Sequence, residues 1–244
     1  MQAISLWRWA VSIEVSKGHL GVCLKRRSRI HLWLYEAGKR IGDCLFSSLA
    51  LLVCSPFAII IAIAIKLDSA GPIFFFQRRV GRRGVPFHMI KFRSMYTNAE
   101  LLRASLVHRR EERGPTFKLA DDPRVTRVGR FLRRTSIDEL PQFLNVLLGQ
   151  MSLVGPRPLP AQDVEDWYEK EPTLARSDIV EWLEQRQQVR PGITGLWQVR
   201  GRSLLSLQDW IRYDLEYVGN RGLVVDAKIL ALTPVVVVLG RGAM

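Results

Sequence analysis

A strongly apolar run without charge fills residues 44–65, between Asp43 and Lys66. As a helix rising about 1.5 Å per residue it would be roughly 33 Å long, enough to cross the hydrocarbon core of a membrane. A helix buried in a soluble core is seldom so long without one charge. Ser55 and Pro56 stand at its centre, and proline removes a backbone hydrogen bond and clashes with the preceding turn. The pattern therefore predicts a membrane helix that is broken at Ser55-Pro56.

Basic residues flank this run on both sides. Residues 1–43 hold eight Lys and Arg against three Asp and Glu, and residues 77–134 hold 16 against five. Because positive flanks mark the cytoplasmic side of a membrane segment, both flanks are expected on the same side. We therefore favour a re-entrant helix. An ordinary kinked transmembrane helix is the alternative, since proline is tolerated in membrane helices.

The remaining periodicity predicts an α+β fold dominated by helices, with amphipathic interfacial helices beside the membrane segment. A β-hairpin is expected from strands at 73–79 and 85–92, joined across a basic tip at 81–84, and a further strand is expected at 193–199. An apolar run at 229–239 is too short to span a membrane and is expected in the core or at the membrane surface. Helices are predicted at 98–113, 124–134, 137–148, 163–188 and 208–218.

We divide the chain into three parts. Residues 1–38 form an N-terminal extension, residues 39–67 the re-entrant membrane helix, and residues 68–244 a cytoplasmic domain that carries the candidate catalytic residues. The extension holds three tryptophans and a basic cluster, and it is expected to be interfacial or partly disordered. It differs from a cleaved signal because Arg8 and Glu14 lie within its apolar portion.

The composition narrows the classes of function. The chain has 36 Lys and Arg against 23 Asp and Glu, a formal net charge of +13, which points to nucleic acid, an anionic membrane surface or a phosphorylated substrate. No helix-turn-helix, zinc-finger, RRM or KH signature is present, so nucleic acid is not expected as a partner. Three cysteines without a CxxC spacing exclude a disulfide framework and a cysteine-rich zinc module. Four scattered histidines leave little room for a histidine metal site.

Two adjacent carboxylates, Asp138 and Glu139, are the sharpest chemical feature. Ser136 and Glu139 have the spacing of a capping box, and Pro141 is typical of a helix start, so a structural cap is one interpretation of Glu139. Asp138 follows the arginine-rich helix at 124–134 and opens the next helix, where positive potential is high. Such surroundings are expected to keep Asp138 ionised, as a nucleophile requires. The arginine face is alternatively a surface that lies on anionic lipid.

Two arginine clusters are candidates for binding phosphate. Arg157 stands between two prolines, a rigid mount that suits bidentate phosphate recognition, although a simple chain reversal would have the same sequence. The segment 190–203 combines glycine turns, Trp197 and three arginines at positions 190, 200 and 202. It suits a nucleotide-phosphate pocket, and glycine turns with a core tryptophan are the structural alternative.

Taken in order, these segments resemble the bacterial sugar transferase family, the monotopic phosphoglycosyl transferases. The resemblance covers the chain from Lys39 to the C-terminus. It rests on seven motifs in family order: Lys39-Arg40 with Asp43, Ser55-Pro56, IKFRSM at 90–95, SIDEL at 136–140, SLVGPRP at 152–158, RPGITG at 190–195 and RYDLEYV at 212–218.

The resemblance implies a reaction, its substrates and its site. Such enzymes move a sugar-1-phosphate from a UDP-sugar to undecaprenyl phosphate and release UMP, as monotopic proteins at the cytoplasmic face of the bacterial inner membrane. It assigns the attack on phosphorus to Asp138, through a phosphosugar-aspartyl intermediate, and an assisting role to Glu139. Mg²⁺ is implied near Asp138, with Asp214 as a further metal-site residue. The residues implied in binding phosphate or nucleotide are Lys91, Arg133, Arg134, Arg157, Arg190 and Arg202.

The stretches at 195–203 and 240–243 resemble family members that use UDP-glucose or UDP-galactose in the first membrane step of exopolysaccharide and capsule synthesis. A hexose of this kind is therefore the expected sugar. A non-catalytic alternative is a membrane-anchored basic scaffold that binds anionic lipid or polysaccharide. The pair Asp138-Glu139 distinguishes the two, because a scaffold would lose nothing from Asp138→Asn. The sequence leaves the oligomeric state open.

Overall fold

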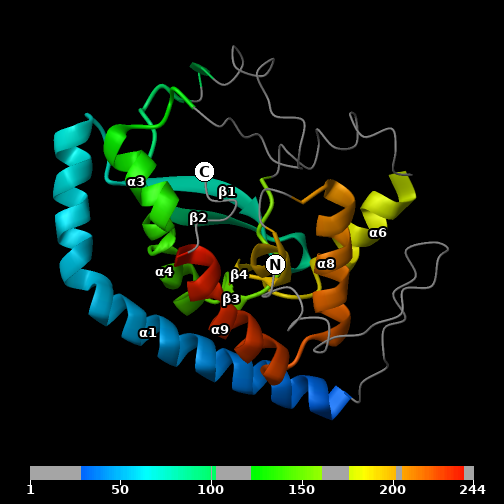
Figure 1. Ribbon diagram of the computed structural model, residues 1–244. Coiled ribbons are helices and arrows are strands. Elements are labelled where there is room, and N and C mark those ends of the chain that lie inside the picture. Colours follow the sequence, from blue (N-terminus) through cyan, green and yellow to red (C-terminus); the bar gives the residue numbers. More distant parts are fainter. Residues whose placement is uncertain (1–28, 100, 103–121, 161–175, 202–204, 239–244) are drawn as a thin grey trace.

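The computed structural model describes residues 29–99, 101–102, 122–160, 176–201 and 205–238. Figure 1 shows a long helix, α1 (Arg29–Asp68), curving around one side of a body made of shorter helices and two small sheets. The helix-dominated α+β fold is confirmed. The shorter elements that position the site are α3 (Arg127–Thr135), α4 (Gln142–Leu147), α6 (Arg176–Arg186), α7 (Leu196–Arg200), α8 (Leu207–Asn220) and α9 (Leu223–Val238).

Helix α1 begins at Arg29, so its first turns take in the end of the expected extension, and residues 1–28 lie outside the described residues. The helix is continuous through Pro56, so the predicted break at Ser55-Pro56 is wrong, and Figure 1 shows α1 bending along its length instead. Proline has no N–H to donate to the carbonyl four residues earlier, which here belongs to Leu52. The Ser55 hydroxyl donates to that Leu52 carbonyl at 2.9 Å instead. The Ser-Pro pair therefore bends the helix without leaving this carbonyl unpaired.

The middle of α1 is long and apolar enough to cross a membrane. Almost none of its most apolar stretch is covered by the rest of the described chain. The core helix of a soluble protein would be mostly covered. Its large exposed apolar side chains include Leu45, Phe46, Leu49, Leu52, Val53, Phe57, Ile59, Ile60 and Ile63.

The N-terminal part of α1 is joined to the body by buried polar contacts. The Asp226 carboxylate on α9 accepts from Tyr35 at 2.9 Å, from Lys39 at 2.6 Å and from Tyr217 of α8 at 2.9 Å. One helical turn later, Asp43 accepts from the backbone N–H of Leu153 at 3.1 Å. Because these groups are buried, the contacts fix α1 against α8 and α9 instead of leaving it as a loose tether.

Two small sheets lie inside the body. Strands β1 (Phe74–Val80) and β2 (Pro86–Phe92) pair antiparallel, with the short 3₁₀ turn η2 (Arg82–Gly84) between them, which confirms the predicted hairpin. Strands β3 (Ser152–Val154) and β4 (Gly192–Thr194) pair in parallel. The second sheet requires glycine at position 155, because a Cβ there would lie 2.4 Å from the Arg190 carbonyl oxygen.

The strand predicted at 193–199 is only partly correct, since β4 ends at Thr194 and α7 follows. The indole of Trp197 turns into a core formed by α6, α7 and α8, where it stacks on Trp210 with ring centroids 4.7 Å apart. Burial of this aromatic outweighs the strand preference of the β-branched residues around it.

The predicted helices fare unevenly. Those at 124–134 and 208–218 are confirmed as α3 and α8. The one at 137–148 is divided into the 3₁₀ turn η4 (Ile137–Glu139) and α4, while α6 is the described part of 163–188. The one at 98–113 lies mostly outside the described residues. The apolar run at 229–239 belongs to α9, where Ile229 is buried and Val235 is exposed.

Candidate active site

The Asp138-Glu139 pair sits in an unusual local backbone. Helix α3 is capped at its start by Thr126, whose hydroxyl accepts from Gly129 N at 2.9 Å. It ends at Ser136, which has the left-handed φ of 59°. The Ser136 side chain makes no capping hydrogen bond, so the capping-box interpretation of Glu139 is wrong. An N-cap residue needs extended backbone, and Ser136 cannot supply it while it ends the preceding helix.

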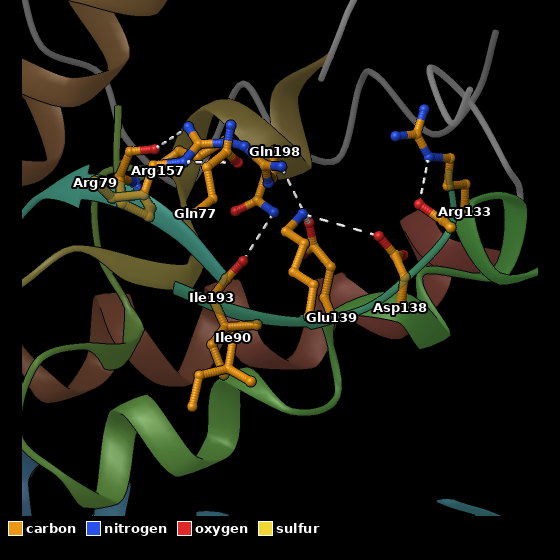
Figure 2. A network of polar contacts seen from close by, with 12 residues as sticks. Gln77, Arg79, Ile90, Arg133, Asp138, Glu139, Arg157, Ile193 and Gln198 are labelled. Atoms are coloured by element: carbon orange, nitrogen blue, oxygen red, sulfur yellow. Dashed lines mark hydrogen bonds and ion pairs between the residues drawn. The ribbon is translucent and has the colours of Figure 1, made fainter. Parts of the chain in front are cut away.

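Glu139 instead binds two cations from distant parts of the chain. Its Oε1 accepts from Lys91 Nζ of β2 at 2.8 Å and from Arg157 Nη2 at 3.0 Å. Asp138 lies beside it, with its Oδ2 at 3.9 Å from the same Lys91 Nζ (Figure 2). Both carboxylates are largely enclosed, and Asp138 is 7% exposed. The fold thus brings together four of the residues that the sequence proposed: Lys91, Asp138, Glu139 and Arg157.

The two carboxylates have opposite electrostatic environments. Burial alone would raise the pKa of Glu139, but the charges of Lys91 and Arg157 outweigh it and hold that pKa well below its usual range. Burial raises the pKa of Asp138, and the negative charge of Glu139 adds to the effect of burial against the pull of Lys91. The surroundings of Asp138 therefore raise its pKa, the opposite direction from the one expected of a positive environment. The sequence shows the arginines near Asp138, but the burial of Asp138 arises only in the folded chain.

Arg133 lies at the edge of this group. It extends from the last turn of α3, and its Nε donates to Ser94 Oγ at 2.9 Å (Figure 2). Its charge lowers the pKa of Asp138, which places it within electrostatic reach of that carboxylate. The neighbouring Arg134 is exposed. The 3.6-residue period explains the difference, since successive side chains point in different directions around a helix.

Asp214 contacts residues of the helical core instead of Asp138. It is 1% exposed, and its Oδ2 accepts from Arg186 Nε at 2.9 Å and from Trp182 Nε1 at 3.3 Å. Burial raises the pKa of Asp214 to about 6, against the opposing charge of Arg186. Arg186 also donates to the Arg157 carbonyl at 2.6 Å. Asp214 is thus linked to Glu139 through Arg186 and Arg157. The sequence analysis did not identify Arg186 as a site residue.

The remaining proposed residues lie elsewhere. Arg190 donates to the Gly149 carbonyl at 3.0 Å, just beyond the end of α4, and Arg40 donates to the Leu147 carbonyl at 2.8 Å. Both arginines thus stabilise the negative end of that helix. Arg202 lies outside the described residues. Among those that the structure describes, no group of three or more His, Cys, Asp or Glu side chains is placed to share a metal ion.

A cavity of about 230 Å³ adjoins the carboxylate pair. Glu139 forms part of its wall, and the other walls come from the end of α3, from η4 and α4, from β4 and α7, and from the last turns of α9. Glu139 therefore contacts Lys91 and Arg157 and also lines this cavity.

The model of the family described as "Bacterial sugar transferase" matches residues 34–240, which include every residue of this site. The chain belongs to the bacterial sugar transferase family. Three similar relatives are the "Galactosyl transferase CpsE" of Streptococcus agalactiae serotype III (strain NEM316), 43% identical; the "Exopolysaccharide production protein ExoY" of Rhizobium meliloti (strain 1021), 40% identical; and the "UDP-glucose:undecaprenyl-phosphate glucose-1-phosphate transferase" of Escherichia coli (strain K12), 40% identical.

These matches cover most of this sugar transferase, but the share of each relative's length that they cover differs. They span 88% of the chain and 45% of CpsE, 84% of the chain and 87% of ExoY, and 80% of the chain and 39% of the Escherichia coli protein. The chain therefore spans less than half of two of these relatives and nearly all of the third. The family resemblance predicted from the motifs is confirmed, and the scaffold alternative is not favoured.

Proposed function

We propose that this sugar transferase moves a hexose-1-phosphate from UDP-glucose or UDP-galactose to undecaprenyl phosphate, with Asp138 as the nucleophile. The observation that carries the proposal is the unequal pairing of two adjacent carboxylates. Glu139 takes the hydrogen bonds of Lys91 and Arg157, whereas the Asp138 carboxylate accepts none within the described residues. The names of the relatives, which include glucose-1-phosphate and galactose phosphotransferases, support the choice of substrates.

The reaction is a double displacement at phosphorus. A carboxylate oxygen of Asp138 bonds to the sugar-bearing phosphorus, and the bond from that phosphorus to the bridging oxygen breaks, so UMP leaves with the electron pair. A phosphate oxygen of undecaprenyl phosphate then attacks the phosphosugar-aspartyl group, the acyl-phosphate bond breaks, and Asp138 is regenerated. Dividing one transfer into two lets a single site serve two anionic substrates in turn.

The basic residues have distinct parts in this proposal. Lys91 and Arg157, held by Glu139, face the diphosphate and offset the charge that gathers on the departing UMP. The positive charge of Arg133, which lies near Asp138, attracts the anionic donor phosphate toward that carboxylate. Glu139 acts by orienting two cations, which its low pKa allows because it stays charged throughout the cycle.

Mg²⁺ is part of the proposal, and the donor set fits it. Magnesium is commonly held by one or two carboxylates together with substrate phosphates, and the Asp138 carboxylate, 3.9 Å from Lys91 Nζ, accepts no hydrogen bond within the described residues. When bound there it would neutralise phosphate charge. Asp214, enclosed by Arg186 and Trp182, is proposed as a positioning residue for Arg157 in place of a metal ligand.

We further propose that α1 is re-entrant, so that the protein is monotopic at the cytoplasmic face of the bacterial inner membrane. Three features support this: the Ser55-Pro56 bend, the basic flanks on both sides of the apolar run, and the uncovered apolar surface of α1. Anionic lipid would then meet the basic flanks, and the exposed apolar side chains of α9 would lie in the interface.

The experiment that tests the reaction uses radiolabelled UDP-sugars, Mg²⁺ and undecaprenyl phosphate, with UMP release and label in the lipid phase as readouts. The native protein should label the lipid with one sugar of the panel, and Asp138→Asn should abolish both signals. Glu184→Gln, which removes an exposed charge on α6, is the matched control and should behave as native. Lipid labelling that survives Asp138→Asn would overturn the assignment of the nucleophile.

A further inference from the structure

The cavity beside Glu139 has no part in the chemistry derived so far. Its volume is about 230 Å³, the room that about eight water molecules occupy in the liquid. Seven of the side chains that line it are apolar: Ile137, Leu140, Phe143, Ile193, Val199, Val236 and Val237. Such walls suit a hydrocarbon group better than a sugar or a nucleobase, both of which need hydrogen-bonding partners.

The threonine hydroxyls that line the cavity form hydrogen bonds within the protein. Thr194 and Thr233 share a hydrogen bond at 2.8 Å between their hydroxyls, and the Thr135 hydroxyl donates to the Phe131 carbonyl at 2.8 Å. The Gln198 amide donates to the Ile193 carbonyl at 2.9 Å (Figure 2). The threonine hydroxyls are therefore engaged within the protein, and the polar atoms left to a ligand include the Glu139 carboxylate and the buried Gln198 Oε1, which has no hydrogen-bond partner among the described residues.

The position of the cavity links the reacting groups to the apolar surface of the molecule. Its lining includes Glu139, which is next to Asp138, and residues from the last turns of α9, where Val236 and Val237 are half-buried and Val235 is exposed. Leu144 of the neighbouring α4 and Leu148, which directly follows that helix, are also exposed. An apolar chain that enters from this surface would therefore bring its head to the carboxylate pair.

We propose that this cavity binds the isoprene unit next to the phosphate of the acceptor lipid, an inference that rests on the function proposed above. The unit nearest the phosphate must lie within a few bonds of the attacking oxygen, and this cavity is an apolar space that adjoins Glu139, the neighbour of Asp138. The donor's uridine and sugar would remain on the side of Lys91 and Arg157. The cavity thus separates the acceptor from the donor within one site.

The test separates the two half-reactions. Exchange of labelled UMP into UDP-sugar requires the donor and Asp138 but no lipid, whereas discharge of the phosphosugar-enzyme requires the acceptor. Val236→Phe would fill the cavity, and Val235→Phe, one residue earlier on the exposed face, is the matched control. We expect Val236→Phe to raise the KM for undecaprenyl phosphate at least about tenfold, the effect of losing the burial of about two methylene groups. Exchange should continue at close to the native rate.

A second measurement needs no variant. Dimethylallyl phosphate, which carries a single isoprene unit, should inhibit transfer of the labelled phosphosugar from the native intermediate to undecaprenyl phosphate more strongly than methyl phosphate does. If Val236→Phe slows exchange as much as discharge, the cavity belongs to the donor and the proposal is overturned. It is also overturned if Val236→Phe matches Val235→Phe in acceptor KM, or if the two phosphates inhibit equally. Absence of exchange in the native protein would instead refute the proposed function itself.

Discussion

Lys91 Nζ lies 3.9 Å from Oδ2 of Asp138, near enough for an ion pair and too far for a hydrogen bond. The same ammonium donates to Glu139 at 2.8 Å. Lys91 is therefore hydrogen-bonded to Glu139 and not to Asp138. The Asp138 carboxylate, which is proposed to attack, has only the longer ion pair with Lys91.

We expect Glu139→Gln to slow transfer about a hundredfold, a size typical of misplaced catalytic groups, while the intermediate on Asp138 remains detectable. A neutral amide holds Lys91 and Arg157 less firmly, so both cations move off the donor phosphates. Acid-quenched single-turnover experiments with labelled UDP-sugar would show label on the protein. Full native activity in Glu139→Gln would mean that the two cations are held by other contacts.

Transfer is expected to fall as the pH is lowered through about 6. Asp214 takes up a proton near its pKa of about 6 and then loses its ion pair with Arg186, which fixes the Arg157 carbonyl. The rate of lipid labelling measured between pH 5 and pH 8 would show this acid limb. Asp214→Asn should lower the rate across the range and remove the limb. A limb that persists unchanged in Asp214→Asn would assign it to another group.

The stability contribution of Asp214 should change in the opposite direction. Its folded-state pKa of about 6 lies above the ordinary value of 3.8, so folding favours the protonated carboxyl. The contribution is full below the ordinary value and is lost as the pH rises through about 6. Thermal unfolding at several pH values should therefore show the native protein losing stability relative to Asp214→Asn as the pH rises. A difference that is independent of pH would contradict the raised pKa.

Labelling from one side of the membrane tests the re-entrant helix. In a background with Cys23, Cys44 and Cys54 replaced, single cysteines at Ile30 and Thr97, both exposed positions, should react only with a reagent on the cytoplasmic side. A membrane-impermeant maleimide applied to inverted and right-side-out vesicles makes the distinction. Labelling of the two positions from opposite sides would show a spanning helix and would leave the proposed reaction standing.

The bend itself can be tested at Ser55-Pro56. Pro56→Ala restores a backbone N–H and lets α1 straighten, so part of the protein should shift its Ile30 label to the opposite side. Ser55→Ala keeps the bend but leaves the Leu52 carbonyl without its hydroxyl partner, at a cost of about 1–3 kcal/mol in apolar surroundings. Thermal unfolding in one detergent would compare both variants with the native protein. Unchanged labelling in Pro56→Ala would show that the flanking charges alone determine the topology.

Asp226→Asn is expected to lower the free energy of unfolding by about 1–3 kcal/mol, because it leaves the half-buried Lys39 without its partner and weakens the hydrogen bonds of two buried tyrosines. Lys39 donates to Asp226 at 2.6 Å, and Tyr35 and Tyr217 use the same carboxylate. Thermal unfolding measures the loss, with Glu184→Gln on the exposed face of α6 as control. Equal stability of the two variants would show that hydration of the amide compensates fully.

Local patterns in the sequence predicted much of this structure. The apolar run gave α1, the apolar alternation around two glycines gave the β1–β2 hairpin, and the periodicity at 208–218 gave α8. Each of these depends on neighbouring residues, which is why the sequence alone was sufficient. The adjacent carboxylates were also visible, because their interest lies in residue type and spacing.

Features that depend on distant contacts were not accessible in the same way. Ser136 has the residue type of an N-cap, but the end of α3 imposes a left-handed backbone on it. Arg186 lies in an ordinary helical pattern and acquires its role only when α6 packs against α8 and meets Asp214. Burial of Asp138, which reverses its expected pKa shift, likewise arises from chain segments far away in sequence.

The attachment of α1 has a practical consequence for preparing a water-soluble form. Deleting the helix would expose Asp226 and remove Asp43, the acceptor of the Leu153 amide. It would also remove Arg40, whose guanidinium donates to the end of α4. The remainder would lose part of its own interior. Replacing the outward-facing leucines and isoleucines of α1 with polar side chains, while keeping its inward contacts, is the route that this architecture favours.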